Sequence, residues 1–233
     1  MLTINRREFL NQVAAGTAAM TIPLNAAPGS VPSGAPSPLS TGASARLAEP
    51  AFRPLPLGAI RPRGWLLRQL KIQAAGLTGH LDEFWPDVGQ SQWFGGTAEG
   101  WERAPYWLDG FIPLAWTLDD PALKAKASKY VDHIVSHQRP DGWFSPYPAD
   151  AATKKYDLWA ILLADKVLAQ YHDATGEERV LKALERSLRA MLAGLDRAPL
   201  YDWGHYRWFE GLVSVFHVYE RTGEPWLLEL GRK

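Results

Sequence analysis

The chain has 233 residues, a formal net charge of zero at pH 7 and hydrophobic residues at 46% of its positions, which is typical of globular proteins. No basic excess is present to attract nucleic acid or an anionic membrane, so these partners are excluded, whereas a neutral glycan fits the charge balance. Cysteine is absent, which excludes disulfides, thiolate zinc sites and a cysteine nucleophile in these residues. We therefore expect no metal or cofactor to be held within this segment.

Residues 1–27 have the pattern of a twin-arginine signal peptide. Arg6 and Arg7 stand in the run Asn5–Leu10, and a weakly apolar stretch from Val13 to Leu24 follows. That stretch is too short and too rich in Ala, Gly and Thr to cross a membrane as a helix. The pattern predicts export to the periplasm or the medium, with no further membrane contact. The alternative is an amphipathic N-terminus without a signal.

Residues 28–56 form a segment rich in Pro, Gly, Ser and Ala, in which Phe52 is the only aromatic residue. Such a composition buries too little apolar surface to offset the entropy of ordering, so it predicts an extended linker. All eleven tryptophans follow it, and we expect a folded domain over 57–233.

Helical periodicity begins at Pro62 and continues to the end of the chain, with two kinds of helix in alternation. Three segments are apolar nearly all round, which predicts burial on most sides: 105–118, 156–174 and 205–221. Two segments are amphipathic: 121–138 and 177–192. A sixth helical turn starts at Pro225. The connection Thr175-Gly176-Glu177 returns as Thr222-Gly223-Glu224, 47 residues later.

This alternation, at a period of about 50 residues, predicts stacked helical hairpins with apolar helices inside and amphipathic helices outside. An α-solenoid and a closed α/α toroid both fit. Aromatic and acidic segments precede each apolar helix and would meet at one mouth, which favours the toroid. A six-hairpin toroid needs roughly 300 residues. About three hairpins are present, so we expect an all-α, partial (α/α)6 toroid in a truncated chain.

The stretch from Gly79 to Arg103 is predicted to be irregular. It mixes aromatic rings with carboxylates, and this mixture suits a glycan cleft, because ring faces stack on sugars and carboxylates accept hydrogen bonds from hydroxyls. A surface loop pinned by hydrophobic anchors is the alternative.

Two carboxylates are candidates for catalysis. Glu102 lies near the start of the first apolar helix, where a first-turn acid paired with Arg103 would also explain it. Asp109 lies within that helix, where a carboxylate is costly unless it is hydrogen-bonded or faces a cavity. A structural carboxylate bonded to the start of a neighbouring helix is the alternative for Asp109.

Seven further residues precede or open the apolar helices and are expected to bind substrate: Trp101, Tyr106, Trp107, Trp143, Asp157, Trp203 and His205. Each has a structural alternative. Trp143 would plug the turn Asp141-Gly142-Trp143-Phe144, Asp157 would cap a helix, and His205 would serve as a structural hydrogen-bonding group. Glu210 is a further carboxylate on the third apolar segment. No local motif identifies an acid and base pair.

Four motifs resemble the N-terminal half of the β-L-arabinofuranosidases of glycoside hydrolase family 127: Leu55–Ile60, Gly64-Trp65-Leu66, Trp101-Glu102-Arg103 and Asp141–Phe144. The resemblance implies an (α/α)6 barrel, usually followed by β-sandwich domains. Gly204-His205 is similar to a family helix whose histidine contacts substrate. Lys155–Trp159 stands where the family has a His-Glu-Leu-Tyr-x-x-Gly-His run, so two family histidines are absent. The resemblance places the cysteine nucleophile, the zinc and the glutamate acid/base in a downstream part.

The sequence therefore predicts a glycoside hydrolase of plant or microbial glycans, with a carbohydrate as its partner. A polysaccharide lyase on the same toroid is one alternative, and an Arg at the mouth that neutralises a uronate would favour it. A non-catalytic helical-repeat scaffold is the other, and a flat, polar inner surface would support it.

Overall fold

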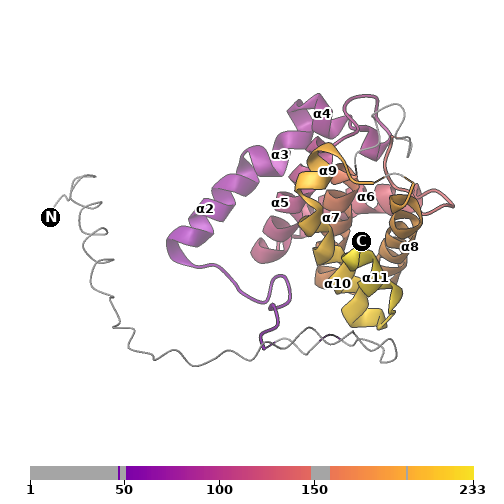
Figure 1. The fold of residues 1–233 in the computed structure, drawn as a ribbon. Helices are drawn as coiled ribbons and strands as arrows, with labels where there is room; N and C mark the ends of the chain where they lie inside the picture. The colour runs from indigo at the N-terminus through magenta and orange to yellow at the C-terminus, as the bar shows by residue number, and fades with distance from the viewer. Residues whose placement is uncertain (1–46, 48–50, 148–157, 198) are drawn as a thin grey trace, which may run out of the picture. The chain divides into compact units, whose positions relative to one another are not determined.

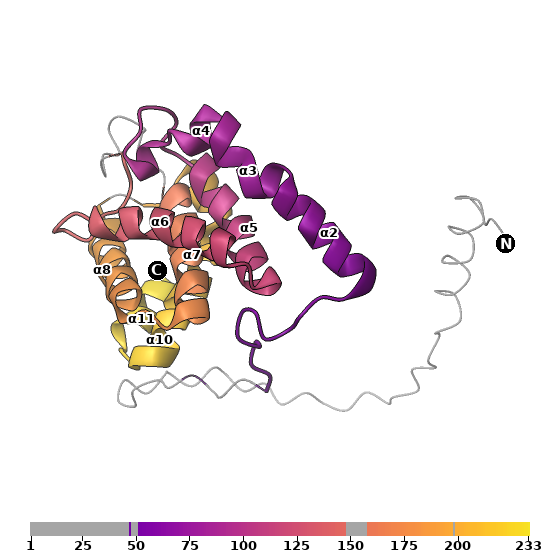
Figure 2. The same ribbon diagram turned by 180° about the vertical axis from the view of Figure 1, so that it is seen from behind.

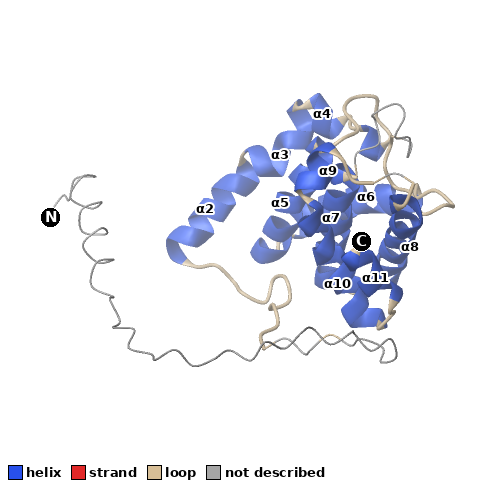
Figure 3. Ribbon diagram, viewed as in Figure 1, coloured by secondary structure: helices blue, strands red, loops and turns tan. Residues whose placement is uncertain are grey.

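The computed structural model describes residue 47 and the ranges 51–147, 158–197 and 199–233 (Figure 1). The predicted signal peptide and Asp157 lie outside the described residues, as does most of the predicted linker. The described residues belong to one compact unit, 44–233. They are helical with no strand (Figure 3), and none of their helices has the length and apolar character needed to cross a membrane.

Three helical hairpins form two rows of helices. The inner row contains α5 (Arg103–Leu118), α7 (Trp159–Thr175) and α10 (Gly211–Thr222), and each neighbouring pair is in contact. The outer row contains α6 (Pro121–Ser136), α8 (Glu178–Leu195) and α11 (Trp226–Arg232), in which α8 contacts the other two (Figures 1 and 2). The predicted alternation of inner and outer helices is thus confirmed.

The core lies between the two rows, and α7 is its centre. Leu158 to Ala164 are all buried, and Trp159 and Tyr171 are each only 1% exposed. The amphipathic helix α6 contributes the predicted stripe, with Ala127, Tyr130, Val131 and Ile134 buried. Burial of one face of α6 and of nearly all of α7 supplies the hydrophobic free energy that holds the hairpins together.

The two connections predicted to be equivalent have the same geometry. Gly176 ends α7 and Gly223 ends α10, each with φ of 69°, in the left-handed region that a glycine adopts at little cost. Thr175 and Thr222 both donate their hydroxyls to the carbonyl four residues earlier, at 2.9 Å.

The stretch from Gly79 to Arg103 is predicted to be irregular, and this prediction is wrong. After α2 (Gly64–Ala75), the chain forms α3 (Leu77–Phe84), α4 (Pro86–Gly89) and the 3-10 helix η1 (Gln92–Phe94). Side chains from α6 anchor α3, because Lys126 Nζ and the Tyr130 hydroxyl both donate to Asp82, at 3.0 and 2.7 Å. The short helices depend on such contacts with a neighbouring helix, which local sequence does not reveal.

The third apolar segment is predicted to be one continuous helix, and this prediction is wrong. It forms α9 (Asp202–Tyr206), the 3-10 helix η3 (Trp208–Glu210) and then α10. The helix is interrupted at Arg207, whose φ of −118° and ψ of 20° are not α-helical. Burial is also less than predicted, since α10 buries only Gly211, Ser214, Val215 and Val218, while Trp208, Phe209, Val213 and Phe216 are exposed.

The N-terminus of α5 is capped by Glu99. Its carboxylate accepts hydrogen bonds from the backbone N–H groups of Glu102, at 2.9 Å, and Arg103, at 3.4 Å. These donors have no partner within the helix, and a negative charge there also complements the helix dipole. Glu99 therefore plays the role that the sequence assigned to Glu102 as its structural alternative.

We predict that Glu99→Ala lowers the free energy of unfolding by about 1 kcal/mol, because it removes the cap of a central helix. Urea denaturation measures the change. Glu220→Ala on exposed α10 is the matched control and should shift the midpoint little. Equal shifts in the two variants would contradict the capping role.

Asp165 on α7 is fully buried, and burial raises its pKa from an ordinary 3.8 to about 8. Ser187 donates a hydrogen bond to Asp165 Oδ2 at 3.1 Å, which opposes the rise, while Oδ1 has no partner among the described residues. The folded protein therefore keeps Asp165 neutral where the unfolded chain ionises it.

The raised pKa of Asp165 makes the free energy of unfolding depend on pH in a definite direction. Because the folded-state pKa is the higher one, the contribution of Asp165 to stability is fully present below about pH 4 and is lost as the pH rises toward 8. We predict that wild type loses up to about 1.4 kcal/mol of unfolding free energy per pH unit in this window, and that Asp165→Asn removes that slope. Urea denaturation between pH 5 and 8 measures it, with exposed Asp196→Asn as control. The same slope in wild type and Asp165→Asn would refute the assignment.

Candidate active site at the start of the inner helices

The N-terminal ends of α5 and α7 meet α9 and η3 at one end of the inner row (Figure 1). Glu102 immediately precedes α5, Trp159 is the first residue of α7, and Arg207 lies between α9 and η3. We call the set Glu102, Tyr106, Trp203, Arg207 and Glu210, which surrounds Trp159, the mouth site.

Glu102 is held by a tryptophan rather than by its own helix. The Trp159 indole N–H donates to Glu102 Oε2 at 2.6 Å, and the Trp159 side chain is almost completely buried. Arg103 does not pair with Glu102, as its sequence alternative required, but lies over the ring of Trp85, 5.6 Å from the centroid. Oε1 of Glu102 accepts no hydrogen bond from the described residues, so one oxygen is available to a ligand.

Arg207 connects the two tryptophans of the site. Its guanidinium carbon lies 4.9 Å from the ring centroid of Trp159 and 5.9 Å from that of Trp203. Its Nη1 donates to Glu210 Oε1 at 2.9 Å. Cation–π contact and the ion pair together fix the guanidinium in place.

Tyr106 lies one turn into α5 and contacts Trp159, with ring centroids 5.8 Å apart. Desolvation raises the pKa of Tyr106 above its ordinary value of 10. The charges of Glu102, Glu210 and Asp109 raise the pKa further, and the charge of Arg207 opposes them. The Tyr106 hydroxyl therefore lies within reach of the charges of the mouth site and of Asp109.

Asp109 is bound by side chains of α7, a neighbouring helix as in the structural alternative, but by residues in the middle of that helix rather than at its start. Lys166 Nζ donates to Oδ2 at 3.0 Å, and Gln170 Nε2 donates to Oδ1 at 2.7 Å. Both carboxylate oxygens thus have donors, and the side chain is 21% exposed. Asp109 ties the middle of α5 to the middle of α7, two helical turns below Glu102.

Trp107 and Trp143 are predicted to bind substrate, but both side chains are buried. Trp107 is 6% exposed, its ring packs on Phe111 and Tyr130, and its indole N–H donates to the Thr78 carbonyl. Trp143 is 7% exposed and donates to the Tyr147 carbonyl, which is the position that the turn-plug alternative describes. Both rings lie in the core, where their apolar surface is buried and each indole N–H has a backbone carbonyl as acceptor.

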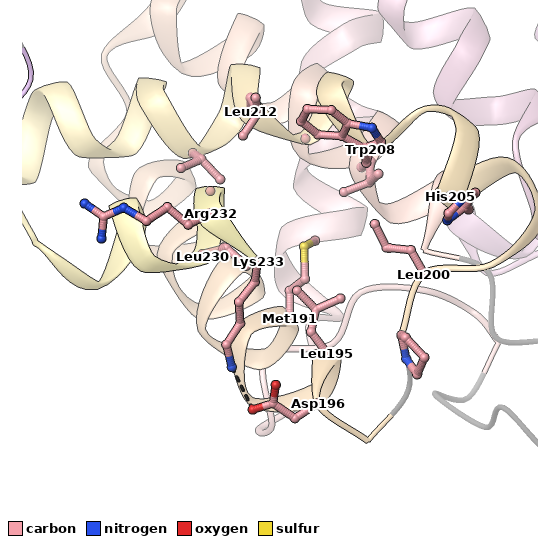
Figure 4. A pocket seen from close by; sticks show the side chains of 15 residues that line it. Met191, Leu195, Asp196, Leu200, His205, Trp208, Leu212, Leu230, Arg232 and Lys233 are labelled. Atoms are coloured by element: carbon pink, nitrogen blue, oxygen red, sulfur yellow. Dashed lines mark hydrogen bonds and ion pairs between the residues drawn. The ribbon is translucent and has the colours of Figure 1, made fainter. Parts of the chain in front are cut away.

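The other predicted substrate residues divide between two places. Trp203 is 47% exposed beside Arg207, and half-buried Trp101 packs against the core just before Glu102. His205 lies two residues from both Trp203 and Arg207, so it points to the opposite side of α9. There it lines a separate pocket of about 580 Å³ (Figure 4).

The Figure 4 pocket is mainly apolar and lies between α8, α10 and α11. Leu195, Leu200, Leu212 and Leu230 point into it, and Lys233 pairs with Asp196 at its rim (Figure 4). Among the described residues, no hydrogen bond, ion pair or ring contact joins the side chain of His205 to the mouth site.

The residues present do not fit the zinc–thiolate centre of the family. The chain has no cysteine, and no group of three or more His, Asp or Glu side chains among the described residues is placed to hold a metal ion. We therefore derive no chemical step through a metal in this chain.

Sequence reasoning missed two residues that organise the mouth site. Trp159 was interpreted only as part of an apolar helix, and Arg207 was not considered. A usable signal for Arg207 was present, since it is the only cation in a strongly aromatic run and stands three residues before Glu210. Nothing local marks Trp159, because its partner is 57 residues away.

Comparison with known proteins identifies the family. No curated protein and no solved structure matches the chain. The family model for the β-L-arabinofuranosidase GH127 catalytic domain matches residues 61–233, a range that contains every helix of the mouth site. Members of this family act on carbohydrate and have the (α/α)6 toroid fold. The chain therefore belongs to the GH127 β-L-arabinofuranosidase family of glycoside hydrolases.

Proposed function

We propose that this chain takes part in the hydrolysis of plant or microbial glycans, with a β-L-arabinofuranosyl group as its substrate unit. The observation that carries the proposal is the set of contacts that the Glu102 carboxylate makes. Glu99 caps α5 and Arg103 does not pair with Glu102, so the side-chain partner of this carboxylate is the Trp159 indole at Oε2, and Oε1 accepts from no donor among the described residues.

The surroundings of Glu102 suit a sugar. Tyr106 and Trp203 are 41% and 47% exposed, so each offers an aromatic surface for the C–H face of a sugar ring. Arg207 and Glu102 supply a donor and an acceptor for hydroxyl groups. A partly apolar surface with a few convergent polar groups is the usual form of a small-ligand site.

Of the two carboxylates predicted to be catalytic, we propose Glu102 as the one that contacts substrate. Asp109 has both oxygens bound by α7, and it stands seven residues along the same helix. Seven residues correspond to a rise of about 10 Å, whereas a retaining pair needs carboxyl groups roughly 5 Å apart. Asp109 therefore supports the site from below, by holding α5 against α7.

The toroid and the export of the protein complete the proposal. The three hairpins described here form one side of an (α/α)6 toroid, with the mouth site at the N-terminal ends of its inner helices. Arg6 and Arg7 support export by the twin-arginine route to the periplasm or the medium, where a glycan substrate would be met.

We predict that Glu102→Gln lowers the rate of arabinose release from an aryl β-L-arabinofuranoside by roughly 10- to 100-fold, because an amide accepts a hydrogen bond from a substrate hydroxyl more weakly than a carboxylate does. The release of the aryl group measures the rate. Glu178→Gln, on the exposed side of α8, is the matched control and should leave the rate unchanged.

Unfolding measurements separate catalysis from folding. Because Glu99 rather than Glu102 caps α5, we expect Glu102→Gln to unfold at nearly the wild-type urea concentration. Full activity in Glu102→Gln would refute the assigned role. Full-length wild-type protein that releases no arabinose would refute the proposed function.

A further inference from the structure

A continuous series of contacts joins η3 to Glu102. Glu210 holds Arg207 by an ion pair of 2.9 Å, Arg207 lies over the face of Trp159, and Trp159 donates to Glu102 at 2.6 Å. The series crosses three elements, η3, α7 and the start of α5, which are not adjacent in sequence. A change at Arg207 is thus transmitted to Glu102 through one ring.

The direction of the indole N–H depends on the plane of the Trp159 ring. The side chain has two rotatable bonds, and a hydrogen bond weakens steeply when its angle falls below about 120°. Arg207 lies over the ring and Tyr106 contacts it at 59°, so these two side chains restrict its rotation. With the ring fixed, Oε2 of Glu102 is occupied, and Oε1 accepts no hydrogen bond from the described residues.

We propose that Arg207 is a positioning residue, which holds the Trp159 indole so that its N–H fixes the carboxylate of Glu102. The proposal rests on the proposed function only in assigning Glu102 to the substrate. Its structural part, the control of the Trp159 N–H by Arg207, stands on the contacts alone.

Arginine suits this role better than lysine. The guanidinium is flat, so it stacks on an indole over its whole plane while an edge N–H donates to Glu210. The Glu210 side chain is 17% exposed, which shields the ion pair from solvent. A lysine ammonium is a compact charge with no plane, so it would keep the ion pair but restrict the ring less.

The test compares Arg207→Met with a matched control, Arg189→Met. Arg189 makes the same two kinds of contact elsewhere, since it lies 4.2 Å from the ring centroid of Trp226 and pairs with Glu185 at 2.9 Å. Hydrogen exchange of the indole N–H protons is followed by NMR in the full chain, with the Trp159 signal assigned from Trp159→Phe. The Trp107 indole N–H, bound to the Thr78 carbonyl in the core, is the internal reference.

We expect Arg207→Met to speed exchange of the Trp159 N–H by roughly tenfold relative to the Trp107 N–H, and Arg189→Met to leave this ratio unchanged. In the aryl arabinofuranoside assay, we expect kcat of Arg207→Met to fall by roughly tenfold with little change in KM, because a misplaced Glu102 carboxylate no longer holds the sugar in its reactive position. Arg207→Lys should lie between wild type and Arg207→Met in both measurements. It also provides the test if Arg207→Met does not fold.

An unchanged Trp159 exchange ratio in both Arg207 variants would overturn the positioning role. Faster exchange with unchanged kcat would overturn it as well, because the ring would then move without consequence for Glu102. If wild type hydrolyses no arabinofuranoside, the proposed function fails, and the exchange ratio still decides whether Arg207 holds the ring.

Discussion

The near-complete burial of α7 is the constraint on which the rest of the structure depends. This helix contacts α5 and α10 in the inner row and α8 in the outer row, and its first residue contacts the mouth site. A helix enclosed in this way cannot shift without opening a cavity on one of its sides. It therefore provides a rigid reference for the side chains of the mouth site, which come from α5, α9 and η3 and the residues beside them.

Burial of α7 also determines where its polar groups find partners. Lys166 and Gln170 point to α5 and bind Asp109, Asp165 points to α8 and accepts from Ser187, and His172 lies 2.9 Å from His217 of α10. Each neighbour is thus joined to α7 by a polar contact as well as by apolar packing. Such contacts fix the rotation of the helix about its axis, because a misrotated helix would leave these groups buried without partners.

Desolvation also lowers the pKa values of the two histidines in contact, His172 and His217. Burial lowers the pKa of His217 to about 3 and also lowers that of His172, with the charge of Arg221 adding to both shifts. The pair is therefore neutral at pH 7, with one ring donating to the other. In contrast with Asp165, this contribution to stability is complete above the ordinary histidine pKa of 6.5 and is lost as the pH falls.

Periodicity in the sequence predicted the hairpins because burial acts on whole helix faces. The apolar run from 158 to 164 can only be buried, and the stripe on α6 needs only one covered side, so the alternation is visible in residue types alone. The repeated Thr-Gly-Glu connection was equally clear, because a glycine with positive φ is a local requirement.

The mouth site was only partly predictable, since its geometry depends on contacts between distant residues. Glu99 and Glu102 have similar sequence surroundings, and only the path of the chain decides which one caps α5. Trp107 and Trp203 both stand beside apolar helices, yet one lies in the core and the other at the surface. The break at Arg207 was also invisible, because the aromatic residues around it suit a helix as well as a turn.

Charge balance at the mouth site favours a hydrolase of neutral sugars over a lyase. An Arg at the mouth was the sequence criterion for a lyase, and Arg207 is such a residue. Its charge, however, is already opposed by Glu210 at 2.9 Å, and Glu102 adds a second negative charge on the other side of Trp159. A uronate carboxylate would meet this pair of acids and be repelled, whereas the hydroxyl groups of a neutral sugar can donate to Glu102 and accept from Arg207. A helical scaffold without a ligand has no comparable reason to gather two glutamates and an arginine around one buried indole.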